Sequence, residues 1–257
     1  MSIEDHRTAV GAVPDALRLG WWGTAWLRGD VVADLMLDAV IGADATHTVS
    51  GLADLGLGGE PGRAETLMAG LGRLRAEGAT VIGTAFPVEG DPVGLGGPPA
   101  FNTGALEAGE AVVTDAGVGL TPVRVGAVID WQAYAAGRRQ LPDVGEADRA
   151  LRAALAESAQ ALADLDVARW RPEVADRLMN LRHRPALRGA PGVPQRCVEL
   201  AARALQARDI VALALEDEGG ALSAYEMSAR RDALVPLDRA ARRALTASGS
   251  PEVWPPA

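Results

Sequence analysis

The stretch Thr80–Asn102 reads TVIGTAFPVEGDPVGLGGPPAFN and does most to indicate how the chain folds. Its first part is apolar and rich in β-branched residues, which is the pattern of a buried strand. The composition then changes to Gly and Pro with two carboxylates, Glu89 and Asp91. Folds commonly place binding groups in a loop that follows a strand. We therefore expect a central strand of a sheet here, followed by a loop, residues 86–99, that borders any small-molecule site.

Upstream of this stretch, Thr46–Leu52 alternates as a strand does, and a helix is predicted over residues 63–77. Strand, helix and the strand of Thr80–Asn102 together have the order of a β-α-β unit. His47, on the first strand, is a candidate general base because its ordinary pKa lies near neutrality. The alternative is a strand histidine that is exposed or hydrogen-bonded within the fold.

A Gly-rich segment, GLGGEPG, connects that strand to the helix. The segment departs from the dinucleotide-binding fingerprint GxGxxG, because Pro61 stands where the last glycine of the fingerprint would be. The backbone amides near Gly58 and Gly59 remain candidates for holding an anion at the start of the helix. The alternative is an ordinary connection without a ligand.

Downstream, the sequence predicts a short helix near residues 102–108 and strands over 110–114, 118–125 and 127–134. The tripeptide Asp115-Ala116-Gly117 predicts a hairpin between the first two of these strands. The N-terminal half should thus contain about five strands and three or four helices around one mixed sheet.

Beyond residue 138 the pattern is helical, with four or five helices predicted up to about residue 247. The charge changes at the same place: residues 1–137 have 7 Arg and 17 acidic residues, whereas residues 138–257 have 18 Arg and 17. We therefore expect an α+β protein with a mixed sheet domain, residues 1–137, and a helical bundle domain, residues 138–250. Residues 251–257 are predicted to be a flexible tail.

The helical half contains a basic segment, RHRPALRGAPGVP, over residues 182–194. Arg182 and Arg184 are candidates for binding a phosphate or a carboxylate. They are equally suited to stabilise the C-terminal end of a helix and to pair with local acidic residues.

A cluster of tryptophans stands out because aromatic residues make up only 4% of the chain. Trp21, Trp22 and Trp26 lie in a predicted helix over residues 14–27, and the spacing of Trp22 and Trp26 places them on one face. One interpretation is that they anchor this helix to the sheet. The other is a surface for a partner, since Trp is frequent at binding hot spots.

Composition argues against several classes of protein. All 25 basic residues are Arg, so a lysine-dependent P-loop, Schiff base or lysine base is ruled out. The three histidines and the single cysteine, Cys197, form no zinc-ligand pattern, and we expect no metal and no cofactor. The alternative is Mg²⁺ or Ca²⁺ bound by carboxylates, in which the chain is rich. The net charge of −9 disfavours nucleic acid as a partner. With no membrane span and no secretory signal predicted, a cytoplasmic location is expected.

Two classes of function remain. The first is a binding, regulatory or assembly protein without a catalytic motif, which docks a protein partner or forms a homo-oligomer. The second is a small-molecule-binding protein or enzyme with a site near residues 86–99. There Glu89, Asp91 and His47 would supply the base, and Arg from the helical half would hold an anionic group.

Overall fold

The computed structural model describes residues 12–164, 186–216 and 224–256. Its six-stranded mixed sheet has the order β2-β1-β6-β5-β4-β3, and only β1 and β6 run parallel. With this sheet in the N-terminal half and helices mainly in the C-terminal half, the predicted α+β class is confirmed. The strands are β1 (Thr46–Ser50), β2 (Glu65–Thr66), β3 (Ile82–Ala85), β4 (Ala111–Thr114), β5 (Val118–Val125) and β6 (Val128–Ala135).

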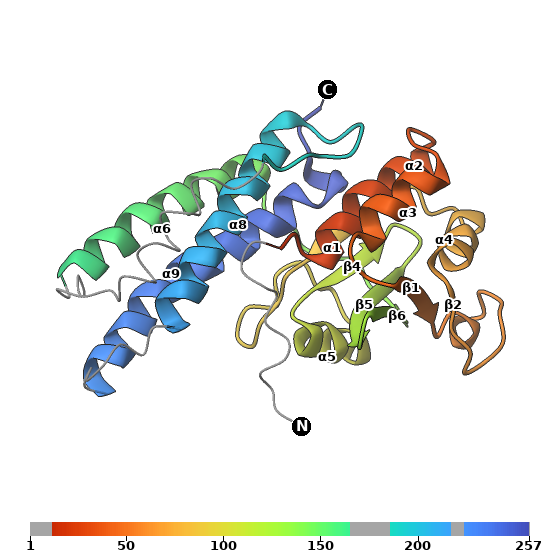
Figure 1. Cartoon of the computed structure of the whole chain (residues 1–257), viewed down its shortest axis with the longest axis horizontal. Helices are drawn as coiled ribbons and strands as arrows, with labels where there is room; N and C mark the ends of the chain where they lie inside the picture. Colours follow the sequence, from red (N-terminus) through yellow and green to blue (C-terminus); the bar gives the residue numbers. More distant parts are fainter. Residues whose placement is uncertain (1–11, 165–185, 217–223, 257) are drawn as a thin grey trace.

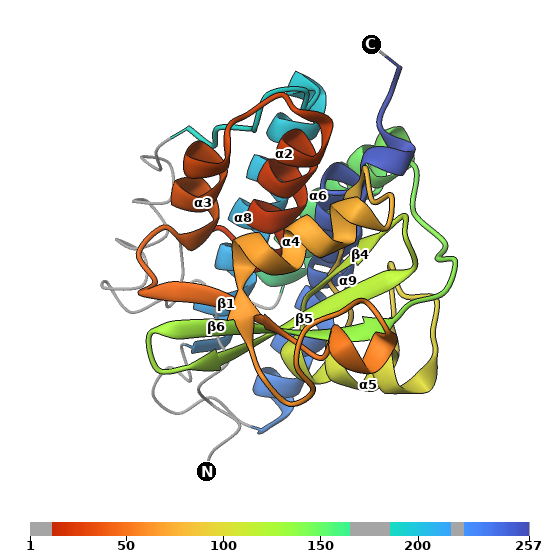
Figure 2. The same ribbon diagram turned by 90° about the vertical axis from the view of Figure 1, so that its right-hand side faces the viewer.

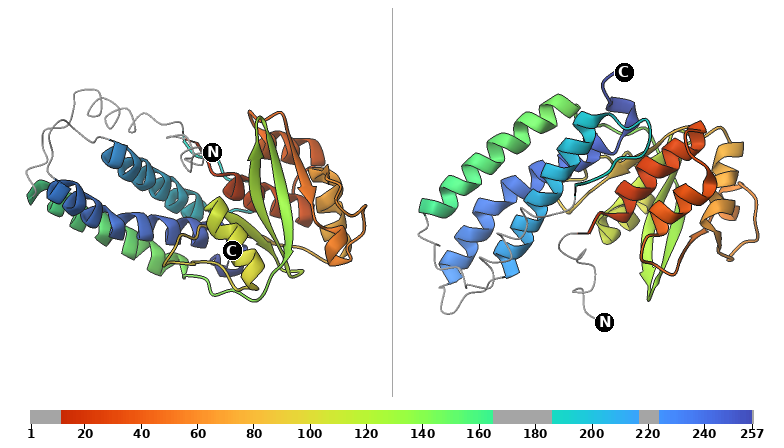
Figure 3. Two further views of the ribbon diagram at one scale, coloured as in Figure 1. Left: turned by 90° about the horizontal axis from the view of Figure 1, so that it is seen from below. Right: turned by 45° about the horizontal axis from the view of Figure 1, so that its top comes forward.

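The long helices α6, α8 and α9 lie together on one side of the molecule, and the sheet lies on the other (Figure 1). Seen nearly edge-on, the sheet has α5 on one face and the N-terminal helices on the other (Figures 2 and 3). The N-terminal half contains α1 (Asp15–Arg18), η2 (Leu19–Gly23), α2 (Thr24–Arg28), α3 (Ala33–Ile41), η3 (Ala53–Leu55), α4 (Leu67–Ala76) and α5 (Pro99–Ala108). The C-terminal half contains α6 (Val144–Asp164), α8 (Gln195–Glu216), α9 (Ala224–Ser248) and η5 (Pro251–Val253).

The first helix is continuous through α1, η2 and α2, and its middle turn, η2, is a π-helix. Two glycines of this turn face the sheet. A Cβ on Gly20 would lie 2.7 Å from Cγ2 of Thr84, and one on Gly23 would lie 2.7 Å from Cδ1 of Ile82. The missing side chains therefore let the helix backbone approach β3 closely.

The prediction of a central strand in Thr80–Asn102 was wrong, because β3 is the last strand of the sheet. Its open edge is covered by side chains. Thr24 Oγ1 accepts from the amide of Ile82 (2.9 Å) and donates to its carbonyl (3.1 Å). Arg139 and Ser250 donate to the carbonyl of Thr84. Other elements cover the strand and satisfy its free backbone groups, so all four of its residues are buried. The sequence pattern of such a covered edge strand is the same as that of a central strand.

The predicted β-α-β unit was also wrong. The parallel partner of β1 is β6, with Thr48 opposite Asp130, whereas β3 pairs with β4. The predicted hairpin is present as β4 and β5 on either side of Asp115–Gly117. Long-range pairing chose β6 over the nearer strand, and local pattern does not determine such a choice.

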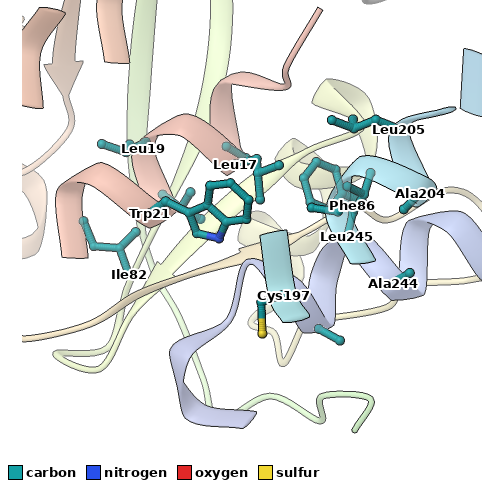
Figure 4. Close-up of a cluster of buried hydrophobic side chains, with 14 of the residues drawn as sticks. Leu17, Leu19, Trp21, Ile82, Phe86, Cys197, Ala204, Leu205, Ala244 and Leu245 are labelled. Atoms are coloured by element: carbon teal, nitrogen blue, oxygen red, sulfur yellow. The ribbon is translucent and has the colours of Figure 1, made fainter. Parts of the chain in front are cut away.

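One continuous apolar core runs from the sheet into the helical half (Figure 4). Leu17 and Trp21 of the first helix lie beside Phe86, and the same cluster includes Cys197 of α8 and Leu245 of α9. Burial raises the pKa of the Cys197 thiol to about 11, so this cysteine is a packing residue. The two halves thus share their main hydrophobic core.

The residues predicted as a tail lie against the body of the protein as far as Trp254. Both Trp254 and Trp21 donate their indole N–H to the carbonyl of Ser248, at 2.9 and 3.0 Å. Glu252 forms an ion pair with Arg139 at 2.6 Å. Residues 165–185, which belong to the predicted helical half, lie outside the described residues.

Candidate functional site

The parallel pair β1 and β6 brings the carboxyl ends of two strands to one edge of the sheet. Ligands of open sheets commonly bind at such an edge, in the crevice beyond the strand ends. A cavity of about 480 Å³ lies there in this protein. Its polar lining consists of Ser50, Asp54, Asp130, Gln132 and Tyr134.

Asp130 is the centre of a hydrogen-bond cluster in this cavity. Strand alternation places Thr48 and Ser50 on the same face of β1, and the parallel register sets Asp130 of β6 beside them. The hydroxyl groups of Thr48 and Ser50 donate to the two carboxylate oxygens of Asp130, at 2.7 and 2.6 Å. These two hydrogen bonds, one to each oxygen, hold the carboxylate in one orientation.

The cavity carries negative charge that the fold does not neutralise. Neither Asp54 nor Asp130 has an ion-pair partner among the residues that the structure describes. A carboxylate with remaining acceptor capacity favours cations and hydroxyl donors and repels anions.

The walls of the cavity are fixed by close packing. Tyr134 donates from its hydroxyl to Oε1 of Gln132 at 3.1 Å, and its ring lies 6.2 Å from that of Phe101 on α5, measured between centroids. Gly51 has φ +83°, and a Cβ there would lie 3.0 Å from the carbonyl oxygen of Ala133. The turn after β1 thus requires glycine, in both conformation and space.

The three predicted catalytic candidates, His47, Glu89 and Asp91, do not come together. β1, which carries His47, and β3, which precedes the other two residues, are four strand positions apart. At the usual strand spacing this is about 19 Å. Glu89 is exposed, whereas Asp91 is only 6% exposed.

Asp91 does face arginines of the helical half. Arg243 approaches one of its carboxylate oxygens at 2.9 Å, Arg242 approaches the other at 3.2 Å, and Arg239 lies at 3.7 Å. Arg242 also donates to the carbonyl of Phe86, at the end of β3. The cluster therefore attaches α9 to the loop after β3, and its carboxylate is already engaged by cations.

His47 is buried, and both of its ring nitrogens have partners. The indole N–H of Trp131 donates to Nδ1 (3.2 Å), and Nε2 lies 3.1 Å from a carboxylate oxygen of Asp44. Because an indole nitrogen only donates, Nδ1 must be unprotonated and Nε2 must carry the proton. Burial lowers the pKa of His47, against the opposing effect of Asp44. Neither nitrogen is free to act as a base toward a ligand.

His47, Asp44 and Asp15 place one ligand atom each within 4.8 Å of one another, which is a spacing that a metal site would need. However, Arg18 and Arg124 each contact both carboxylates. The two negative charges are thus matched by two guanidinium groups, and the donor set fits an ion-pair cluster better than a cation site.

Gly58 and Gly59, predicted as anion-binding positions, pack against the ion pair of Glu65 and Arg73 instead. Gly62 of the same segment does line the cavity. Arg182 and Arg184 lie outside the described residues.

The three tryptophans do not form one exposed surface. Trp21 and Trp26 are buried, and Trp26 has the guanidinium of Arg75 5.0 Å from its ring centroid. Trp22 is half-buried. Two of the three therefore serve as anchors of the first helix.

Sequence reasoning missed Ser50, Asp130 and Tyr134 as site residues. A signal was present: Asp130, Gln132 and Tyr134 alternate with apolar residues along their strand, so they share one polar face, and a carboxylate within a strand needs partners. What the sequence did not reveal was the parallel pairing that sets Thr48 and Ser50 beside it.

Comparison with known proteins identifies the family. The model for the N-terminal domain of Rv1486c-like proteins matches residues 16–144, and the model for their C-terminal domain matches residues 145–246. The chain belongs to the Rv1486c-like protein family. It is 30% identical, over an alignment covering 93% of this chain and 98% of the relative, to the uncharacterized protein Rv1486c of Mycobacterium tuberculosis (strain ATCC 25618 / H37Rv).

The uncharacterized protein MT1533 of Mycobacterium tuberculosis (strain CDC 1551 / Oshkosh) matches at the same identity and coverage. No solved structure matches the chain. Within the described parts of this Rv1486c-like protein, none of the helices combines the length and apolar character needed to span a membrane. The comparisons thus establish the family and leave function to be inferred from the site.

Proposed function

We propose that this Rv1486c-like protein binds a small molecule rich in hydroxyl or amino groups in the cavity beyond the ends of β1 and β6. The observation that carries the proposal is the pair of carboxylates, Asp54 and Asp130, in a cavity of about 480 Å³ without a described cationic partner. This volume is within the range of small-molecule sites.

The lining sets the chemistry of the ligand. Asp130 and Asp54 accept hydrogen bonds, and so does Ser50, whose hydroxyl hydrogen is donated to Asp130. The side-chain amide of Gln132 is able both to donate and to accept. A polyol offers several donors at once, and a protonated amine adds attraction to the two negative charges. Phosphate esters and nucleic acids are disfavoured, because no described arginine lines this cavity.

Binding without covalent chemistry fits the residues best. The hydroxyl of Ser50 donates a hydrogen bond to Asp130, and no described histidine lines the cavity to act as a base for it. A serine in this setting is a hydrogen-bonding group and is not an activated nucleophile. Small-molecule binding is the second class of the sequence analysis, but the cavity lies at β1 and β6 and not near residues 86–99.

The test is calorimetric titration of the full chain with glucosamine, glucose and spermidine, accompanied by thermal shift. We expect at least one amine-containing probe to bind, and Asp54→Asn to weaken it by about tenfold, since loss of one charged hydrogen bond is worth about 1.5 kcal/mol or more. Asp54 is exposed, so this variant is expected to fold normally. Asp38→Asn, at an exposed position of α3, is the matched control. If no probe binds, or if Asp54→Asn behaves like Asp38→Asn, the proposal is wrong.

A further inference from the structure

A second cavity, of about 330 Å³, lies on the other side of the first helix from β3. It is formed by the first helix, by α3 through Ala39, and by residues 186–188 ahead of α8. It thus lies where the N-terminal and C-terminal family domains meet. It shares no lining residue with the cavity at β1 and β6.

The walls of this cavity are mainly apolar. Trp21 and Trp22 line it from the π-helical turn η2, and Leu187 lines it from the segment ahead of α8. A π-helical turn inside a helix is rare and is frequent at functional sites. In this protein the turn places its glycines against β3 and two adjacent indole rings at the cavity.

The charged groups in the lining are both arginines. Arg188 is exposed, and Arg18 lies deeper, with its guanidinium bound to Asp15 and Asp44. Nε of Arg18 is buried and has no hydrogen-bond partner in the described structure. A buried donor left without an acceptor is costly, and a ligand oxygen would relieve that cost.

We propose that this cavity binds an apolar molecule that carries a single carboxylate. The apolar or aromatic body lies against Trp22 and Leu187, and the carboxylate pairs with Arg188 and approaches Arg18. Arginine suits this task, because its planar group donates two parallel hydrogen bonds to a carboxylate. The proposal does not rest on the polyol or amine site, which has the opposite charge preference.

The experiment titrates the full chain with 3-phenylpropionate and, as an uncharged match, 3-phenylpropionamide. We expect the carboxylate to bind, and the amide to bind more weakly by about tenfold, because it lacks the charge-assisted hydrogen bonds. Arg188→Gln should weaken the carboxylate by a similar factor. Ala39→Leu should abolish binding of both compounds by filling the cavity.

Two controls separate this site from the rest of the surface. Arg63→Gln removes an arginine that is 74% exposed and lies in the Gly-rich connection, and it should leave binding unchanged. Asp54→Asn, in the other cavity, should also have no effect. Equal binding of acid and amide, an unchanged affinity in Arg188→Gln or Ala39→Leu, or no binding of 3-phenylpropionate would each overturn the proposal.

Discussion

The two ends of the sheet use aspartate in opposite ways. At the β3 end, the buried Asp91 is contacted by three arginines of α9, and the helical half covers the strand edge. At the β1 and β6 end, Asp130 is held by two hydroxyl groups and faces a cavity. A carboxylate whose charge the fold neutralises is thus a structural group, whereas one that keeps its acceptor capacity is available to a ligand.

The largest expected effect is at the β3 end. Asp91→Asn removes the carboxylate that three arginines of α9 share and leaves the buried Arg242 with Asp238 as its remaining ion-pair partner. We expect the free energy of unfolding to fall by about 3 kcal/mol. Urea denaturation measures this loss. Glu89→Gln, in the same loop but exposed, should change stability by less than about 0.5 kcal/mol. Similar values for the two variants would contradict a structural role for Asp91.

A second prediction tests the close packing of the first helix on β3. Gly20→Ala places a Cβ within 2.7 Å of Thr84 and should destabilise the protein by about 2 kcal/mol. Gly72→Ala is the matched control, because it lies in a helix and its Cβ would meet nothing within 4 Å. That substitution should stabilise by about 0.5 kcal/mol, since alanine loses less entropy than glycine in a helix. Equal effects on thermal unfolding would show that the contact with β3 is loose.

A third prediction concerns Glu110, between the two ends of the sheet, which accepts the Ala16 amide of the first helix at 2.8 Å. Burial, together with the charge of Asp15, raises the pKa of Glu110 from 4.5 to about 7. Between these pH values the folded protein holds a proton that the unfolded chain has lost, so stability falls as pH rises through this window.

Glu110→Gln cannot ionise and still offers an acceptor. Between pH 5 and pH 8, the stability of this variant relative to the wild type should increase by about 1 kcal/mol. This value is smaller than the full shift in the pKa of Glu110 would give, because solvent screens part of the interaction. Denaturant titrations at both pH values provide the measurement. A difference between variant and wild type that stays constant with pH would refute the raised pKa.

The smallest effect is expected at the open end. Asp130→Asn keeps an acceptor for a hydroxyl donor and leaves no buried cation unpaired. The free energy of unfolding should therefore fall by only about 0.5 kcal/mol. The same variant should lose affinity for any ligand of the cavity. A loss of stability as large as that of Asp91→Asn would remove the contrast between the two ends.

The local sequence pattern was sufficient to predict most helices and strands, but it was insufficient to predict which strands lie next to one another. The hairpin of β4 and β5 was predicted because Asp115–Gly117 specifies a turn, and the helical character of the chain beyond residue 138 was predicted from its apolar spacing. The position of β3 was predicted wrongly, since Thr24, Arg139 and Ser250 cover its edge from distant parts of the chain. A strand that is buried on all sides has the same apolar composition at the edge of a sheet as in its centre.

The candidate site followed the same division. Glu89 and Asp91 were chosen because they follow a strand in a loop rich in Gly and Pro, which is a local property. Asp130 became a site residue only when β6 paired with β1 in a parallel register. His47 is not available as a base, because Trp131 and Asp44 form hydrogen bonds with its two ring nitrogens.

The amino-acid sequence was enough to predict that this Rv1486c-like protein is an α+β chain with a sheet half and a helical half. Hydrophobic periodicity and turn residues depend on positions that are close in sequence, so they predict helices, strands and turns without a structure. The identity of neighbouring strands, the carboxylate that pairs with arginine and the carboxylate that faces a cavity became known from the three-dimensional fold alone. Those outcomes depend on contacts between residues far apart in sequence, where packing and burial set the free energy.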